Sequence, residues 1–339
     1  MTPERQGQRG VALITVMLVA ALASVLAITM LGRQHLSIAK TRQVVYSQQA
    51  LEQALGAEAW VQALLRRDLE EDTEQPPVDG LTDSWATLGA DSAPLELEAG
   101  SLEIRVRDLS GLLNLNAVVD AAGVDRMKRL LDVLGIDQAL AEAIRDWIDE
   151  DQEVQAGGAE DGRYLVQDPP YRTANAPFTS VTELRLLPGV DADVHARLMP
   201  FVAALPTGFR RVNVNTAPGP VLAALAPGGE PERIMAFAAP DPPWADATEL
   251  IAREVAFTVE AGVLATRSRF FEVLIRAEHG GQRVTLRSRV YRDPETGRTI
   301  VTGRDLARNF DRWGRLPDTD SDMNDDDDDA GRLPQLENR

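Results

Sequence analysis

A long run of apolar residues stands near the start of the chain and continues into a stretch of mixed character. Residues 11–31 contain no charged side chain. As a helix rising about 1.5 Å per residue they would span roughly 30 Å, the thickness of a bilayer's hydrocarbon core. Apolar residues then recur at helical spacing as far as Leu64, and no proline occurs between Val11 and Glu74. We predict one long helix over 11–74, amphipathic in its second half.

Two pairs of alternating segments predict antiparallel strands. Apolar and polar residues alternate over 95–98 and 101–107, and again over 270–277 and 283–291 with a Gly-Gly turn between them. A block rich in Leu and Ala, from about 112 to 205, separates the pairs and favours helices. The order predicts an α+β fold, in which a small antiparallel sheet packs on the long helix and receives a large all-helical insertion.

These patterns divide the chain into six predicted segments. They are a leader peptide (1–10), the long helix (11–74), the first part of the αβ domain (75–110), the helical insertion (111–262), the C-terminal strands (263–295) and an acidic, disordered tail (296–339). The tail is predicted from the run Asp318–Asp329, whose like charges repel each other. Loose calcium binding by that run is the alternative.

A weak internal repeat lies in the predicted insertion. Residues 135–140, Gly-Ile-Asp-Gln-Ala-Leu, recur as Gly-Val-Asp-Ala-Asp-Val at 189–194. The repeat resembles helix-hairpin-helix units of the SAM-like class, some of which bind DNA. Here Asp137 and Asp191 would repel phosphate, and the net charge of -18 argues in the same direction. We expect a packing module and no nucleic acid.

Composition limits the chemistry of this protein. The 339 residues include no cysteine, which excludes disulfides, thiolate metal sites and cysteine nucleophiles. No serine-hydrolase elbow, phosphate-binding loop or zinc-protease motif occurs. We predict that the chain is not an enzyme. The alternative kept open is a membrane-anchored periplasmic metal-dependent hydrolase that uses carboxylates around Asp149.

Acidic residues crowd the segment from Asp146 to Asp161. Counted from Asp149, their spacing follows the twelve-residue EF-hand loop, but Val154 occupies the position where that loop needs glycine. Ligands made only of oxygen would favour Ca²⁺ over zinc. A solvated acidic loop without a metal is the alternative.

The N-terminal run allows three interpretations. A cleaved secretory signal would end near Ala21-Leu22-Ala23, and an uncleaved signal anchor would keep the whole segment. A pilin-like leader would be cut between Gly10 and Val11, so that the apolar helix is retained. The third interpretation is favoured because the run continues past Ala23 and passes directly into an amphipathic helix.

Several motifs together resemble one family. They are Gln8-Arg9-Gly10 before the apolar run, Asn114-Leu115-Asn116, Asp146-Trp147-Ile148-Asp149, Gly158-Ala159-Glu160-Asp161, Tyr171-Arg172-Thr173-Ala174-Asn175 and Asn213-Val214-Asn215-Thr216-Ala217. Over about residues 8–290 the chain resembles the K-type minor pseudopilins of type II secretion systems. Most pseudopilins carry glutamate at the fifth position of the processed helix, whereas the K-type lacks it. Thr15 stands there in this chain.

The resemblance implies a function and a location. It implies a subunit at the tip of the pseudopilus, which takes part in pseudopilus assembly and in export of folded periplasmic proteins across the outer membrane. It implies a single-pass inner-membrane protein with a periplasmic globular domain. Implied partners are the I-, J- and H-type minor pseudopilins, the prepilin peptidase, the inner-membrane secretion platform and exported substrates.

The resemblance also implies bound calcium in the helical insertion. The ligands are expected among one set of oxygen-bearing side chains: Asp149, Asp151, Glu160, Asp161, Asp168 and Asn175. The processing site is expected at Gly10 and Val11, and Thr15 is expected to matter for assembly.

Overall fold

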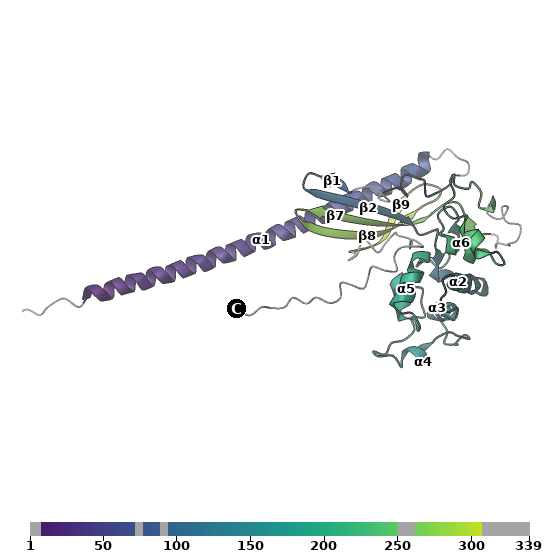
Figure 1. Cartoon of the computed structure of the whole chain (residues 1–339), viewed down its shortest axis with the longest axis horizontal. Coiled ribbons are helices and arrows are strands. Elements are labelled where there is room, and N and C mark those ends of the chain that lie inside the picture. The colour runs from purple at the N-terminus through teal and green to yellow at the C-terminus, as the bar shows by residue number, and fades with distance from the viewer. Residues whose placement is uncertain (1–7, 72–76, 89–93, 250–261, 307–339) are drawn as a thin grey trace, which may run out of the picture.

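A single helix forms the longest element of the structure. The computed structural model describes residues 8–71, 77–88, 94–249 and 262–306. Helix α1 (Gln8–Glu71) projects far beyond the rest of the chain at its N-terminal end (Figure 1). Side chains from Leu13 to Val45 are exposed, and this part is long and apolar enough to cross a membrane. The predicted long helix is confirmed, with bounds shifted from 11–74.

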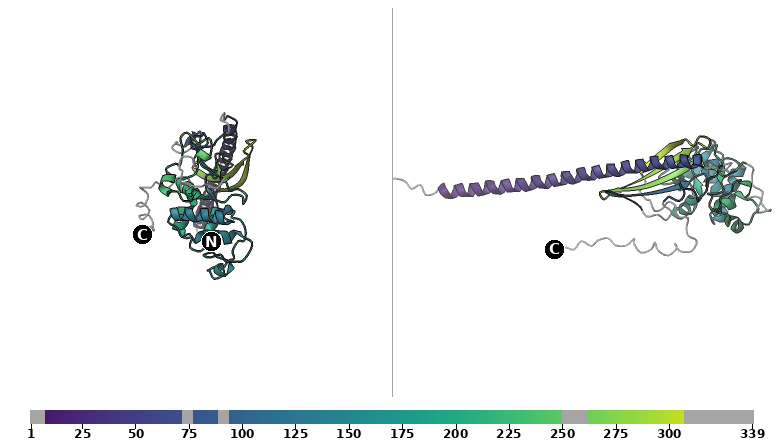
Figure 2. Two further views of the ribbon diagram at one scale, coloured as in Figure 1. Left: turned by 90° about the vertical axis from the view of Figure 1, so that its right-hand side faces the viewer. Right: turned by 90° about the horizontal axis from the view of Figure 1, so that it is seen from above.

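A five-stranded antiparallel sheet packs along the C-terminal half of α1 (Figure 2). Its strand order is β1-β2-β7-β8-β9. The strands are β1 (Leu95–Leu97), β2 (Gly100–Asp108), β7 (Phe270–His279), β8 (Gln282–Arg292) and β9 (Thr299–Leu306). Both predicted hairpins are confirmed, β1 with β2 and β7 with β8.

Small residues let the helix lie close to the sheet. Ala50, Ala54, Ala57 and Val61 recur every three or four residues, so they share one helical face, and all are buried against apolar side chains of β7 and β8. A fully buried Trp85 closes one end of this core. Burying one large apolar side chain contributes roughly 1.5–3 kcal/mol, so this face holds the sheet on the helix.

A buried carboxylate ties the edge strand β9 to α1. Glu58 is 2% exposed and accepts hydrogen bonds from Arg304 Nε (2.7 Å), Arg304 Nη2 (2.6 Å) and Ser288 Oγ. Strand β9 therefore belongs to the sheet, which corrects the predicted tail over 296–339. The sequence Thr-Ile-Val-Thr at 299–302 does not alternate between apolar and polar residues, so it has no clear strand pattern. The run Asp318–Asp329 lies outside the described residues.

The predicted insertion leaves the sheet after β2 and returns at β7. Its helical elements are η1 (Leu115–Ala117), α2 (Ala121–Val133), α3 (Leu140–Ile148), α4 (Asp161–Tyr164), η2 (Val181–Leu186), α5 (Ala192–Leu198), η3 (Met199–Phe201), α6 (Gly219–Leu225) and α7 (Pro231–Met235). Two short parallel pairs also occur, β3 (Leu113–Asn114) with β4 (Val202–Ala203) and β5 (Val212–Asn213) with β6 (Leu264–Ala265). They correct the prediction of an all-helical insertion.

The two parallel pairs mark two copies of one unit. In the first, Asn116 donates to the carbonyl of Phe178 and accepts from its amide; in the second, Asn215 does the same with Trp244. Such paired bonds satisfy buried backbone groups that no strand or helix serves.

A helix N-capping motif follows each of the two residues that the asparagines bind, Phe178 and Trp244. Ser180 and Glu183 form a capping box, and the Glu249 carboxylate likewise accepts from the backbone amide of Asp246. This duplication differs from the six-residue repeat at Gly135 and Gly189, because both of those glycines lie within the first copy, between β3 and β4. Those two glycines do occupy equivalent turns, with φ of +64° and +83°.

Truncation at two points tests whether β9 is structural. A chain ending at Arg298 loses Arg304 and leaves Glu58 buried without its cation, which costs about 3–5 kcal/mol. We expect its melting temperature, followed by circular dichroism in detergent, to fall by about 10 °C.

The matched control is a chain that ends at Leu306, which keeps β9 and should melt within about 2 °C of the full chain. Equal melting of the two truncated chains would contradict a structural role for β9.

Candidate functional site

Two groups of carboxylates could hold a cation among the described residues. One contains Asp68, Asp79 and Asp83; the other contains Asp149, Asp151 and Glu160. In each, the oxygen atoms lie within 4.8 Å of one another. The two groups differ in how their charge is balanced.

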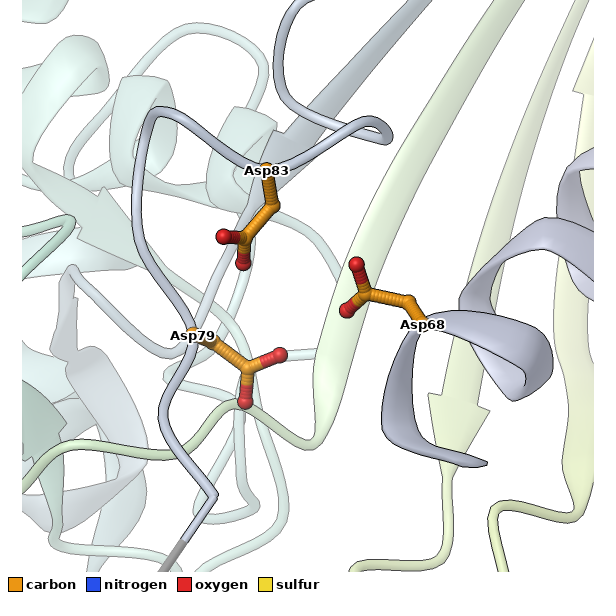
Figure 3. Close-up of side chains that lie close together, drawn as sticks. All are labelled: Asp68, Asp79 and Asp83. Carbon is orange, nitrogen blue, oxygen red and sulfur yellow. The ribbon is translucent and has the colours of Figure 1, made fainter. Parts of the chain in front are cut away.

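The first group already contains a protein cation. Figure 3 shows Asp68, at the end of α1, directed toward Asp79 and Asp83 of the 77–88 segment. Arg292, 1% exposed, forms ion pairs with Asp79 and with Asp68 (3.5 Å). Burial and the neighbouring carboxylates raise the pKa of Asp68 to about 7. No buried carboxylate oxygen of this group lacks a hydrogen-bond partner, so the arrangement is a structural ionic junction.

The second group has no ion pair with a protein cation among the described residues, and several of its oxygens have no hydrogen-bond partner. Glu160 is 3% exposed, and neither of its carboxylate oxygens has a hydrogen-bond partner. Oδ1 of Asp149, Oδ1 of Asp146 and Oδ1 of Asn175 are also buried and unpaired. Desolvating acceptors without replacement bonds is costly, and desolvating charged ones more so. Asp149, Asp151 and Glu160 therefore form a compact carboxylate group, and Asp146, whose charge acts on Glu160, and Asn175 have further buried oxygens without a partner.

Local structure brings these side chains together. Asp146 lies on α3 and Asp149 caps its end, while Glu160 directly precedes α4. Asn175 adopts a left-handed backbone conformation, φ +44°, and donates from Nδ2 to the carbonyl of Asp151 (3.1 Å). This bond uses the amide nitrogen, and the buried amide oxygen, which has no hydrogen-bond partner, remains an acceptor that a cation could use.

Aromatic packing fixes the base of the site. Trp147 lies edge-on to Tyr164 with ring centroids 5.4 Å apart, and stacks on Phe178 at 6.1 Å. All three rings are buried. Trp147 follows Asp146 in the chain, and Tyr164 lies shortly after Glu160. The packing of the two rings therefore fixes the distance between α3 and α4, and with it the distance between the two carboxylates.

Mutual repulsion raises the proton affinity of the carboxylates. Burial, followed by the charges of Asp146, Asp149 and Asp151, raises the pKa of Glu160 to about 7. Burial also raises the pKa values of Asp146 and Asp149. Both effects disfavour the charged form, and a bound cation would reverse both.

The structure brings three of the predicted ligands together and places others outside that group. Asp149, Asp151 and Glu160 converge, and the Asn175 oxygen is unpaired nearby in the same loop system. Asp161 instead accepts from Arg172 (2.5 Å) and from the amide of Thr173 (3.1 Å). Asp168 lies in the exposed 165–170 stretch, outside the group of three.

Sequence reasoning left Asp146 out of the ligand set. This residue is fully buried, and its Oδ2 accepts from the amide of Gln155 (3.2 Å). Its position three residues before Asp149, on the same helical face, could have indicated its place in the site.

The N-terminal residues of interest lie on α1. Gly10 and Val11 fall within its first turn, and their side-chain surroundings lie outside the described part of the chain. Thr15 is exposed on the apolar half of the helix. This half of α1 therefore offers its whole circumference to lipid or to neighbouring helices.

Comparison with known proteins identifies the family of the chain. A family model described as type II secretion system (T2SS), protein K, matches residues 111–207. Type II secretion system protein K of Pseudomonas aeruginosa is 37% identical over 325 residues, covering 90% of this chain and 94% of that protein. The Aeromonas hydrophila protein K is 32% identical and is covered over 93% of its length. The chain belongs to the protein K family of type II secretion systems. Its role is therefore that of a minor pseudopilin.

A solved structure has the same architecture. One chain of the GspK–GspI–GspJ complex from the enterotoxigenic Escherichia coli type 2 secretion system superposes with a TM-score of 0.68 at 25% identity. The match covers 80% of this chain and all of that one. The predicted α+β pseudopilin fold is confirmed at this level.

A glycine beside the acidic site offers a test of its packing. A Cβ on Gly158 would lie 2.0 Å from Oδ2 of Asp146, so Gly158→Ala should displace that carboxylate. Overpacking of this kind costs about 1–3 kcal/mol, measurable as a lower midpoint in urea unfolding.

Gly162→Ala is the matched control, because a Cβ there meets no atom within 4 Å. An unchanged midpoint for Gly158→Ala would show that the carboxylate is not held where the structure has it.

Proposed function

We propose that this protein occupies the tip of the pseudopilus, where it assembles with the I- and J-type minor pseudopilins. The observation that carries the proposal is the structural match to a chain crystallised with GspI and GspJ. Thr15 supports it, because a tip subunit has no neighbour above whose N-terminal amine a carboxylate would have to meet. The H-type pseudopilin, the secretion platform and exported substrates are the further partners.

The proposed location is the inner membrane before assembly. The uncharged half of α1 holds the subunit in lipid, and the sheet and helical domain lie on the periplasmic side. Assembly transfers the same helix into the filament core. The duplicated helical region is proposed to belong to the SAM-like, helix-hairpin-helix class, and to serve packing without nucleic acid.

A structural role without catalysis accounts for the chain. The family consists of secretion-system subunits, and the comparisons give the metal-dependent hydrolase alternative no support. The carboxylates that alternative would use are the ones that converge around a cation position.

Processing by the prepilin peptidase tests the retained helix. We expect the mature protein from membranes to begin at Val11 with a methylated N-terminus, as read by intact-mass spectrometry.

Gly10→Leu should leave the leader attached and prevent co-purification with the I- and J-type subunits. The neighbouring exchange Gly7→Leu, as a control, should be processed normally. A mature chain that starts beyond Ala23 would contradict the proposal.

We also propose that calcium binds between Asp146, Asp149, Asp151, Glu160 and Asn175. The donor set consists of oxygens alone, which Ca²⁺ prefers, and it includes five buried oxygens with no other partner. Bound calcium would offset the repulsion among the carboxylates and join α3, α4 and the loop that follows. A cation at 100 times its Kd stabilises the fold by about 2.7 kcal/mol.

The raised pKa of Glu160 gives calcium binding a pH signature. Without metal, the folded state holds a proton up to about pH 7 that the unfolded state releases near 4.5. Unfolding therefore releases protons between these values, and metal-free stability should fall as pH rises through that window. Calcium binds the deprotonated form, so its stabilisation should be larger at pH 7.5 than at pH 5.

Glu160→Gln separates charge from packing. At pH 7.5 we expect the metal-free variant to melt higher than the unsubstituted chain, and the calcium-induced shift to disappear. Asp168→Asn, a charge-matched control outside the group, should keep the calcium shift. A full shift in Glu160→Gln, or none in the unsubstituted chain, would remove the calcium proposal.

A further inference from the structure

A cationic pocket lies where the second repeat returns to the sheet. It has a volume of about 550 Å³ and is bounded by the segments around β5, β6 and the start of β7, together with Pro294 and Glu295. Three arginines line it, Arg211, Arg267 and Arg269. They come from both sides of the β5–β6 pair, so the fold, and not the local sequence, brings them together.

None of the three arginines pairs with a carboxylate among the described residues. Arg267 donates to the carbonyl of Pro294, while Arg211 is exposed and Arg269 is half-buried. Arg292 and Arg304, in contrast, form direct ion pairs with the buried carboxylates of Asp79 and Glu58. In a protein of net charge -18, three neighbouring arginines without a salt bridge among the described residues form a local reversal of charge.

The carboxylates at the pocket's rim do not balance these charges. Asp246 accepts from the amide of Thr248 (2.9 Å), and this bond lowers its pKa. Glu295 is exposed and follows the Asp293 turn, where its amide is held by the Asp293 carboxylate (3.0 Å). Asp293 itself is bonded mainly to the backbone amides of Thr296 and Glu295, which lower its pKa; the charge of Arg269 also lowers its pKa, so this carboxylate offsets one of the three arginines in part. Like charges lining a concave surface reinforce one another's field, so the pocket attracts anions.

We propose that this pocket binds this chain's own acidic run, Asp318–Asp329, through its carboxylate side chains. A guanidinium presents paired donors that match a carboxylate, and three spaced guanidiniums fit successive acidic residues better than a single small anion. The run has eight aspartates among twelve residues, so its charge is opposite to that of the pocket.

The chain's own segment has the reach to enter the pocket. Glu295 lines the pocket, and β9 begins four residues later and runs for eight residues. The strand carries the chain roughly 25 Å away. The twelve residues from 307 to 318 span up to about 40 Å when extended, which is enough to return.

Peptide binding to the protein in detergent micelles tests the proposal. The probe is a fluorescent peptide of residues 318–329, measured by anisotropy at 20 mM salt against a chain ending at Leu306. We expect saturable binding that weakens at least tenfold in Arg211→Glu/Arg269→Glu and by less in Arg211→Gln/Arg269→Gln. Added salt should weaken it as well. Arg185→Glu/Arg283→Glu, which reverses two exposed charges elsewhere, should bind unchanged.

The full chain tests whether its own run occupies the pocket. We expect the full chain to bind the peptide at least tenfold more weakly than the chain ending at Leu306, because the attached run competes. Equal binding by the two chains would show that the run does not occupy the pocket, which overturns the proposal. The proposal is overturned by absence of saturable binding, by binding that survives both arginine reversals, or by equal binding of a peptide with asparagine at every aspartate.

Discussion

The guanidinium of Arg292 joins the three parts of this fold. Its nitrogen atoms reach the carbonyl of Leu65 on α1, Asp79 in the segment after α1, and the carbonyl of Ser268 at the exit from the helical domain. The side chain is almost fully buried and lies 4.9 Å from the ring centre of Phe271. Removing one member of a buried ion pair leaves the other uncompensated, so helix, sheet and insertion are energetically coupled here.

A polar network continues from this junction into the helical domain. Asp79 accepts from the amide of Ser268, whose hydroxyl donates to Asp108 at the end of β2. Thr216, beside the second Asn-x-Asn pair, donates to the same aspartate. Burial raises the pKa of Asp108 to about 6 even with these bonds. The entry and exit of the insertion are thereby held together by hydrogen-bonded polar groups, in addition to the apolar contacts of Leu109 and Leu112 with Phe270 and its neighbours.

Periodic patterns predicted the large elements well, and non-local contacts explain what they missed. The uncharged run and the two alternating hairpins led directly to α1, β1–β2 and β7–β8. Strand β9 was missed because its place in the sheet depends on Glu58, more than two hundred residues earlier in the chain. The duplication of the Asn116 unit at Asn215 was missed because these two side chains act on residues 62 and 29 positions away. At the acidic site the sequence predicted three carboxylates that the structure brings together, Asp149, Asp151 and Glu160. It could not separate them from Asp161, which an arginine eleven residues later neutralises.

The insertion leaves the sheet from β2 and re-enters it at β7, and these two strands are hydrogen-bonded neighbours in continuous register from Gly100 to Asp108. The helical domain is thus connected to the sheet through two adjacent strands that are hydrogen-bonded to each other, and the buried ion pairs of α1 support this sheet. A force applied along the axis of the long helix is therefore transmitted rigidly to the helical domain, because two paired strands and not a flexible linker join that domain to the sheet. The helical domain and α1 should therefore move as one body.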